Sequence, residues 1–283
     1  MRRLEGIIER GSGPPLVLVP GIQGRWEWMR HAVAALATRF RVLTFSLAGE
    51  PSSRAPLDPA LGFDSFISQI DSVLDRTGVA SATVCGVSFG GLIAYRYAAL
   101  RPARVRQLVL ASALPPDYQP DDYLDFYGRA PHLLAPLFLM GALRRGRVEL
   151  WAAMPGMADR IRFAATAGWS AVRAPASPTR MCDRLALLTR ANLAATTRPD
   201  IPALVVTGDA DLDKVVPVGL TERYLTLLPR AERATLERTG HNGILTRADA
   251  FASLVAEFHA RHDAPAGPVG LEDGGSDATR APS

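Results

Sequence analysis

The chain has 283 residues, of which 48% are hydrophobic and 21% are charged; this composition supplies a buried core and excludes a wholly disordered chain. No apolar run reaches the roughly 18 residues of a membrane span, and the N-terminus lacks the apolar stretch of a secretory signal. The net charge is +4, but the arginines are scattered and no nucleic-acid motif accompanies them. We therefore expect neither a membrane span nor a nucleic-acid partner.

The cysteine content indicates the compartment. Cys85 and Cys182 are too few for a disulfide framework, and their spacing is not that of a metal site. Free thiols are typical of a reducing compartment. We therefore predict a cytoplasmic protein without a bound metal.

Short apolar segments alternate with amphipathic ones along most of the chain. The apolar segments lack period-two alternation, which is typical of strands covered on both faces. Five predicted strands cover residues 16–19, 41–45, 82–86, 107–112 and 203–207, and a weaker sixth covers 234–237. Predicted helices cover 64–76, 91–100, 221–228 and 248–259. The alternation predicts an α/β fold with a doubly wound, mostly parallel sheet.

One long interval interrupts this alternation. Residues 115–198 contain helix-like pieces at 130–143, 148–157 and 181–193, separated by proline and glycine, and no convincing strand. We therefore predict one domain over residues 1–262, with a core at 14–114 and 199–262 and a helical cap inserted at 115–198. Residues 263–283 are rich in Gly, Pro and Asp without periodicity, so a disordered tail is predicted.

The strongest local motif is Gly86-Val87-Ser88-Phe89-Gly90, between a predicted strand and a predicted helix. Flanking glycines allow a tight turn that exposes the serine oxygen at the edge of a sheet. A serine hydroxyl needs a base to act as a nucleophile, so an acid and a histidine should follow at later strand ends. Several aspartates follow Gly208, and His241 follows Gly240 after the sixth predicted strand.

These motifs, in this order, resemble the α/β-hydrolase fold superfamily in its form with a helical cap, over about residues 14–259. The resemblance implies a triad of Ser88, an aspartate and His241. The Gly-x-x-Asp spacing from Gly208 selects Asp211, whereas the family's Asp-x-x-x-Pro spacing, counted back from Pro217, selects Asp213. Because distance from the strand end limits where a side chain can reach, we favour Asp211.

The resemblance also implies an oxyanion hole made of two backbone N–H groups. The candidates are the N–H of Phe89, after the nucleophile, and that of Ile22, in the loop after the first predicted strand. This chain has Pro20-Gly21 where many members have His-Gly, and Ser46–Ser52 lacks the aspartate that many members carry after the second strand. Neither departure removes a residue that the chemistry needs.

The nucleophile type narrows the reaction. Haloalkane dehalogenases and epoxide hydrolases of this fold use an aspartate at the elbow, so Ser88 argues against both. We predict a serine hydrolase without a cofactor that cleaves a small, largely apolar carboxylic ester through an acyl-serine intermediate. An acyltransferase, a perhydrolase, a C–C hydrolase, a non-catalytic binding protein and a homodimer are left open.

Overall fold

The computed structural model describes residues 2–119 and 128–263. The strands are β1 (Arg2–Leu4), β2 (Ile7–Arg10), β3 (Pro15–Val19), β4 (Arg41–Phe45), β5 (Ala82–Val87), β6 (Val105–Ala111), β7 (Ala203–Thr207) and β8 (Ala231–Thr235). They form one eight-stranded sheet in the order β1-β2-β4-β3-β5-β6-β7-β8. Strand β2 runs antiparallel to β1 and β4, and all other neighbours are parallel.

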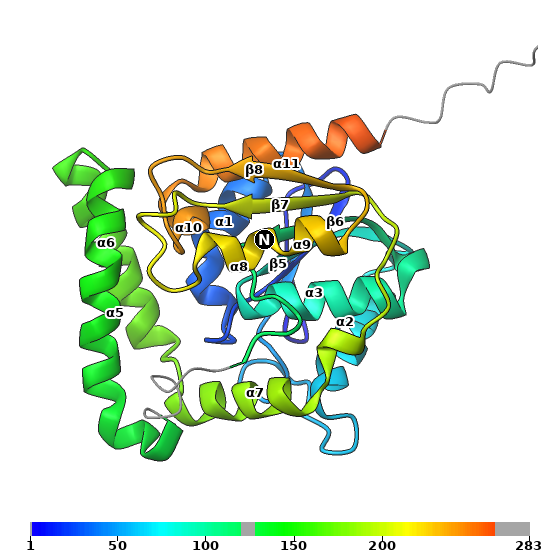
Figure 1. Cartoon of the computed structure of the whole chain (residues 1–283), viewed down its shortest axis with the longest axis horizontal. Coiled ribbons are helices and arrows are strands. Elements are labelled where there is room, and N and C mark those ends of the chain that lie inside the picture. The colour runs from blue at the N-terminus through cyan, green and yellow to red at the C-terminus, as the bar shows by residue number, and fades with distance from the viewer. Residues whose placement is uncertain (1, 120–127, 264–283) are drawn as a thin grey trace, which may run out of the picture.

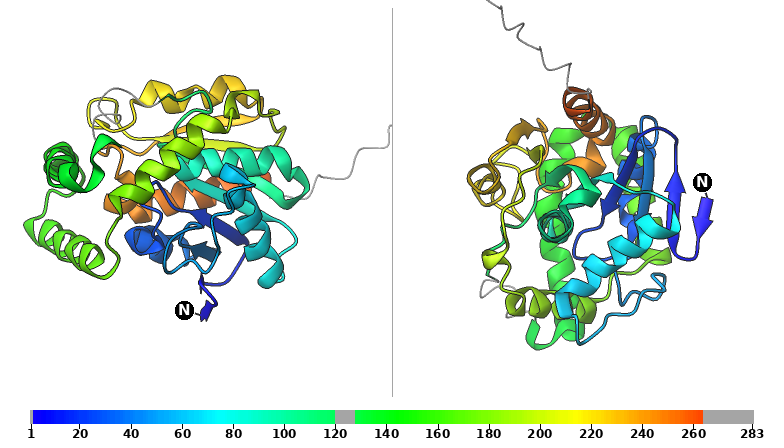
Figure 2. Two further views of the ribbon diagram at one scale, coloured as in Figure 1. Left: turned by 90° about the horizontal axis from the view of Figure 1, so that it is seen from below. Right: turned by 90° about the vertical axis from the view of Figure 1, so that its right-hand side faces the viewer.

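Helices cover both faces of the sheet (Figures 1 and 2). The core helices are α1 (Arg30–Leu36), α2 (Ser65–Arg76), α3 (Phe89–Leu100), α8 (Val218–Glu222), α9 (Tyr224–Leu227), α10 (Gly243–Thr246) and α11 (Ala248–His262). Successive residues of β3 point to opposite faces: Leu16 packs with residues of α1 and α11, and Val17 packs with residues of α2 and α3. The predicted doubly wound, mostly parallel α/β sheet is thus confirmed.

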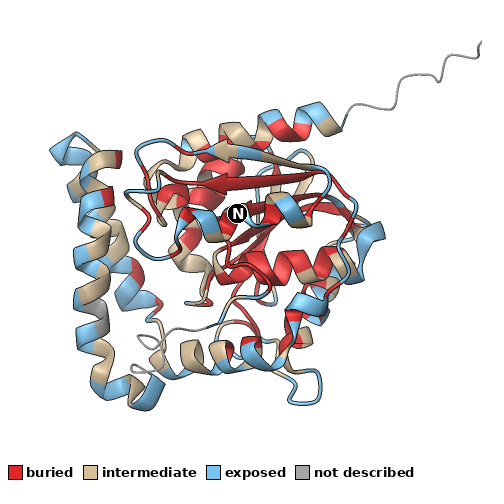
Figure 3. Ribbon diagram, in the orientation of Figure 1, coloured by how far each residue is buried: buried red, intermediate tan, exposed pale blue. Residues whose placement is uncertain are grey.

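Between β6 and β7 the described residues form helices and no strand. The cap helices are α5 (Pro131–Ala153), α6 (Met157–Arg173) and α7 (Pro178–Arg190), and short 3-10 turns lie at Trp26–Met29, Gly62–Asp64, Pro102–Arg104 and Leu193–Ala195. In Figure 1, α5 and α6 stand to the left of the sheet, and α7 runs along the bottom of the view. Figure 3 shows that the cap helices are far more exposed than the strands.

Several boundaries differ from the sequence predictions. The pieces predicted at 130–143 and 148–157 form the single helix α5, which continues through Pro136 and Gly146. Helix α7 begins at Pro178 because the Ser177 side chain accepts a hydrogen bond from the Arg180 N–H, which caps the helix. The helix predicted at 221–228 is two short helices, α8 and α9.

The edges of the sheet were the least predictable. Strands β1 and β2 form a hairpin that turns at Glu5 and Gly6, where Gly6 has φ of 93°. Strand β8 lies at 231–235 rather than 234–237, and its residues are only partly buried. Edge strands are covered on fewer sides, so their sequences lack the continuous apolar signal.

Two predictions about the whole chain stay predictions. They are the core and cap boundaries and the disordered tail, which falls, from residue 264 onward, outside the described residues. Within residues 2–119 and 128–263, no helix combines the length and apolarity that a membrane span requires.

Candidate active site

The predicted site residues follow the carboxyl ends of β3, β5, β7 and β8. These four strands are parallel, so the loops that follow them meet at one edge of the sheet. This edge is where open α/β sheets bind ligands.

Ser88 occupies a sharp turn between β5 and α3. Its backbone has φ of 53° and ψ of −121°, a conformation that is costly for a residue with a side chain. The Ser88 N–H still donates to the carbonyl of Ala111 on β6, at 2.9 Å. Phe89 opens α3, so its N–H belongs to the first turn, where N–H groups have no partner within the helix.

The glycines around Ser88 permit this turn. A Cβ on Gly86 would lie 2.2 Å from the Gly90 carbonyl oxygen, and a Cβ on Gly90 would lie 2.4 Å from that of Pro20. Backbone atoms cannot move aside as the ends of flexible side chains can. The turn therefore needs glycine at both positions.

Gly90→Ala is expected to lower the free energy of unfolding by about 2 kcal/mol or more, because the new methyl group meets backbone atoms of the β3 loop. Urea denaturation measures this loss. Gly219→Ala is the control, since a Cβ there meets no atom of the described residues within 4 Å. Equal stability of the two variants would contradict the packing described at the elbow.

Asp213, not Asp211, lies beside His241. Oδ2 of Asp213 is 3.5 Å from Nδ1 of His241, and the Asp213 side chain is only 2% exposed. The other oxygen, Oδ1, accepts hydrogen bonds from the N–H groups of Val215 and Val216, at 3.0 and 2.9 Å. Contacts of a catalytic histidine are often long without substrate, and 3.5 Å fits an electrostatic pair that can shorten.

The environment of Asp213 favours its ionised form. Burial alone would raise the pKa of this carboxyl group, but His241 and the two backbone N–H groups oppose burial and hold the pKa below its usual value. An ionised, oriented carboxylate next to an imidazole is what a triad acid must supply.

Contrary to the preference for Asp211, the loop geometry brings Asp213 to His241. The chain turns after β7, with the N–H groups of Leu212 and Asp213 both donating to the Asp209 carbonyl. This turn carries Asp213 back over the strand end and leaves Asp211 exposed to solvent. The number of residues between β7 and an aspartate therefore does not tell how close its side chain comes to His241. Asp209 has a different role, since its side chain accepts the N–H of Arg238.

The His241 loop packs tightly against the Asp213 loop. A Cβ on Gly240 would lie 2.3 Å from the Leu212 carbonyl oxygen, and one on Gly208 would lie 2.4 Å from that of Thr239. The Asp209 N–H donates to the Thr239 carbonyl at 2.8 Å. Two glycines thus let the loops meet with His241 facing Asp213.

Glu149, on cap helix α5, is a buried acid that the sequence analysis missed. The residue is 2% exposed, and Oε2 accepts the backbone N–H and the side-chain Nδ2 of Asn242, at 3.1 and 3.2 Å. Burial raises the pKa of Glu149, although the Asn242 contacts and His241 oppose the shift. A cap carboxylate therefore holds the residue next to His241.

Glu149→Gln should flatten the pH dependence of stability. A carboxyl group with a raised pKa in the folded state binds its proton more tightly when folded, so stability falls as pH rises above the unfolded value of about 4.3. Glutamine keeps an acceptor for Asn242 and removes the titration. Urea unfolding between pH 4 and 7 tests this, with the exposed Glu257→Gln as control. An unchanged pH profile in Glu149→Gln would refute it.

The second oxyanion candidate lies beside the elbow. A Cβ built on Gly21 would be 3.6 Å from the Ser88 Cβ, so the Gly21–Ile22 peptide neighbours the nucleophile. The Gly21 carbonyl accepts the N–H of Gly24 at 2.9 Å. Because the two polar groups of a trans peptide point in opposite directions, this bond turns the Ile22 N–H away from Gly24.

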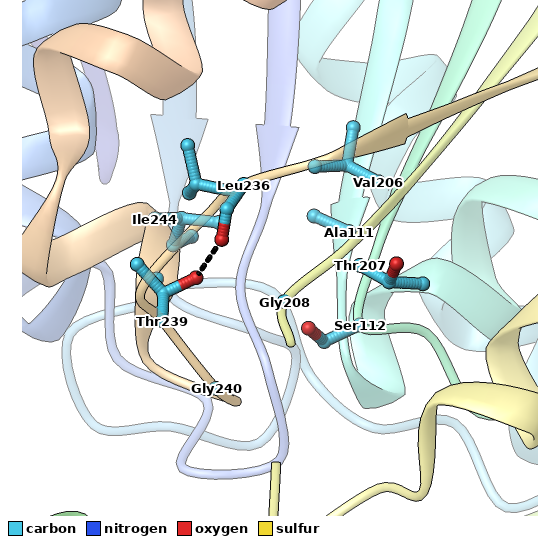
Figure 4. A pocket seen from close by; sticks show the side chains of 10 residues that line it. Ala111, Ser112, Val206, Thr207, Gly208, Leu236, Thr239, Gly240 and Ile244 are labelled. Carbon is cyan, nitrogen blue, oxygen red and sulfur yellow. Dashed lines mark hydrogen bonds between the residues drawn. The ribbon is translucent and has the colours of Figure 1, made fainter. Parts of the chain in front are cut away.

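A small pocket adjoins the site at the ends of β6 and β7. Ala111, Ser112, Thr207 and Gly208 line one side, and Thr239 and Gly240 of the His241 loop line the other (Figure 4). The cap aromatics Trp151 and Trp169 are 57% and 46% exposed, so these rings are not buried in a pocket. The cap aromatics at 123, 126 and 127 lie outside the described residues.

Comparison with known proteins agrees with this fold. A family model described as the alpha/beta hydrolase fold matches residues 14–248. The chain therefore belongs to the α/β-hydrolase fold family, as its motifs suggested, and is an enzyme of that fold.

Three curated relatives show the range of activities. A polyketide synthase, ThaQ, of Burkholderia thailandensis is 31% identical over 89% of the chain, which spans only 12% of that much longer protein. A 2-hydroxymuconate semialdehyde hydrolase of a Pseudomonas species is 29% identical over 91% of both chains. A pimeloyl-[acyl-carrier protein] methyl ester esterase of Nitrosomonas europaea is 30% identical over 86% of this chain and 94% of its own. Hydrolysis is common to the two relatives of matching length.

Proposed function

We propose that this enzyme is a serine hydrolase that cleaves small, largely apolar carboxylic esters through an acyl-serine intermediate. Ser88 is the nucleophile, His241 the general base, and Asp213 the acid that orients His241. The observation that carries the proposal is the strained elbow at Ser88, on the same sheet edge as His241 and the buried Asp213 beside it.

The reaction has two halves of similar chemistry. His241 takes the Ser88 hydroxyl proton as the serine oxygen attacks the ester carbonyl, and Asp213 stabilises the imidazolium that forms. The N–H groups of Ile22 and Phe89 stabilise the negative oxygen of the tetrahedral intermediate. His241 then protonates the departing alcohol, and a water molecule, activated by His241, releases the acid from Ser88.

Esters are the favoured substrate class because a relative of matching length bears the name of a methyl ester esterase. The other such relative, named a 2-hydroxymuconate semialdehyde hydrolase, supports C–C bond hydrolysis as the second candidate. The cytoplasmic location stays a prediction, and acyl transfer to other acceptors, perhydrolysis and a homodimer stay open alternatives.

The experiment has two steps. A fluorophosphonate probe followed by peptide mass spectrometry should find the label on Ser88. Failure to label that serine would refute the proposal, and so would labelling of another residue. A p-nitrophenyl ester series and 2-hydroxymuconate semialdehyde are then compared by kcat/KM. A higher value for the semialdehyde would favour the C–C hydrolase, and no turnover of either would favour a binding protein.

A further inference from the structure

Arg184 is a buried arginine that the cap contributes to the core. It lies on α7, and its side chain is 3% exposed. One guanidinium nitrogen, Nη1, donates to the carbonyl of Ile22 at 2.8 Å. The other, Nη2, donates to Oε1 of Glu50 at 2.5 Å. One rigid fork thus joins the cap to the loops after β3 and β4.

Glu50 lies in the loop where this chain departs from the family pattern. Its side chain is fully buried, and Arg180, also on α7, makes a second contact with Oε1 at 3.2 Å. Nε of Arg184 and Oε2 of Glu50 are buried and have no hydrogen-bond partner among the described residues. An incompletely satisfied buried ion pair is a poor source of stability, so its presence calls for another role.

The contacts fix the loop that carries the candidate oxyanion donor. The peptide before Ile22 is held through the Gly21 carbonyl by the Gly24 N–H, and the peptide after Ile22 is held by Arg184. Both peptide planes that flank Ile22 are therefore set. The direction of the Ile22 N–H depends on these two bonds.

The fit between Arg184 and this loop is close. Gly24 has φ of 73°, and a Cβ there would lie 2.4 to 2.6 Å from three guanidinium atoms, so only glycine lets Arg184 reach Ile22. The Gly24 carbonyl accepts the N–H of Leu47, which ties the same loop to the segment that carries Glu50.

The cap also grips the end of this loop. Nε1 of Trp28 donates to the Ala174 carbonyl at 3.0 Å, and the Ser170 hydroxyl donates to the Glu27 carbonyl at 3.4 Å. Of these cap contacts, the one made by Arg184 lies next to the Ile22 N–H, the candidate oxyanion donor. The cap therefore holds the loop at both ends.

We propose that Arg184 is a positioning residue for the oxyanion hole, acting through the Ile22 carbonyl with Glu50 as its counter-ion. This inference rests on the proposed serine hydrolase function. Without Arg184, the loop that carries Ile22 would shift, and the Ile22 N–H would no longer donate to the oxyanion of the tetrahedral intermediate. Binding of the ester itself would change little. The loss should therefore appear in kcat rather than in KM.

Two variants test the inference without leaving an unpaired buried charge. Arg184→Lys keeps the charge beside Glu50 but cannot span both contacts, and the double variant Arg184→Met with Glu50→Met replaces the pair by apolar groups of similar length. Both should lower kcat by about 100-fold, the effect of losing one oxyanion donor, with KM within about threefold. Arg180→Met is the matched control and should keep kcat within about twofold, because Arg180 meets Glu50 but not Ile22.

A second readout separates positioning from general damage. Affinity for a trifluoromethyl ketone, which forms a tetrahedral adduct on the serine, should fall by the same factor as kcat/KM. If either folded variant keeps the kcat and ketone affinity of the unmodified enzyme, or if kcat falls while ketone affinity does not, the inference is overturned. Fluorophosphonate labelling of Ser88 in the unmodified enzyme is recorded in parallel, so a failure of the proposed function is recognised separately.

Discussion

Replacing Ser88 with alanine is expected to lower kcat for ester hydrolysis by about 10⁶-fold, because no other group can form the acyl intermediate. The rate that remains would come from substrate binding and the oxyanion N–H groups. The fold should persist, since the Ser88 side chain makes no hydrogen bond to any residue that the structure describes. Its backbone N–H, which alanine keeps, makes the contact with Ala111.

Ser112 provides a matched control for this variant. It is a buried serine with a positive φ of 43°, at the end of the neighbouring strand β6, and its N–H donates to Val206. Ser112→Ala should keep kcat within about tenfold, as expected outside a catalytic unit. Ester turnover in purified Ser88→Ala at the rate of the unmodified enzyme would show that Ser88 is not the nucleophile.

Asp213→Asn is expected to lower kcat by about 10⁴-fold, because an amide next to His241 stabilises the wrong tautomer and not the imidazolium. Asp211→Asn changes an exposed side chain in the same turn and should leave kcat within about twofold. Steady-state kinetics on one ester compares the two. A large loss in Asp211→Asn with none in Asp213→Asn would restore the assignment favoured by the sequence.

The same variant has a stability signature. Because the pKa of Asp213 is lowered in the folded protein, its carboxylate contributes stability above the unfolded pKa of about 3.9, and this contribution is lost as pH falls through the folded value. Asp213→Asn should therefore remove part of the acid sensitivity. Urea unfolding from pH 6 down to pH 3 measures the change, and Asp211→Asn is again the control.

The candidate site residues that the sequence proposes most directly share one property. Ser88, Phe89 and His241 sit within short motifs next to strand ends, so a few consecutive residues reveal both the local turn and its chemistry. The five central strands were predictable because burial on both faces leaves a continuous apolar signal. The edge hairpin β1–β2 carries no such signal.

The remaining site residues depend on tertiary packing. Asp213 was not favoured because its loop turns back over the strand end, and no spacing rule measures that turn. Glu149 and Arg184 come from the cap, far along the chain from the groups that they contact. The sequence did hint that Arg184 is buried. It is a charged residue four positions before Leu188, on the buried side of an amphipathic helix.

The contacts that attach the cap to the core limit how the substrate specificity can be changed by exchanging the cap. Glu149 binds the residue after His241, and Arg184 binds the loop of Ile22, so each half of the site carries one ionic anchor from the inserted helices. Exchanging these helices for those of a relative would remove both contacts. Glu50 would then be buried without a counter-ion. In a chimera designed for a new ester, the cap helices should therefore be exchanged together with segments 21–25, 46–53 and 240–243.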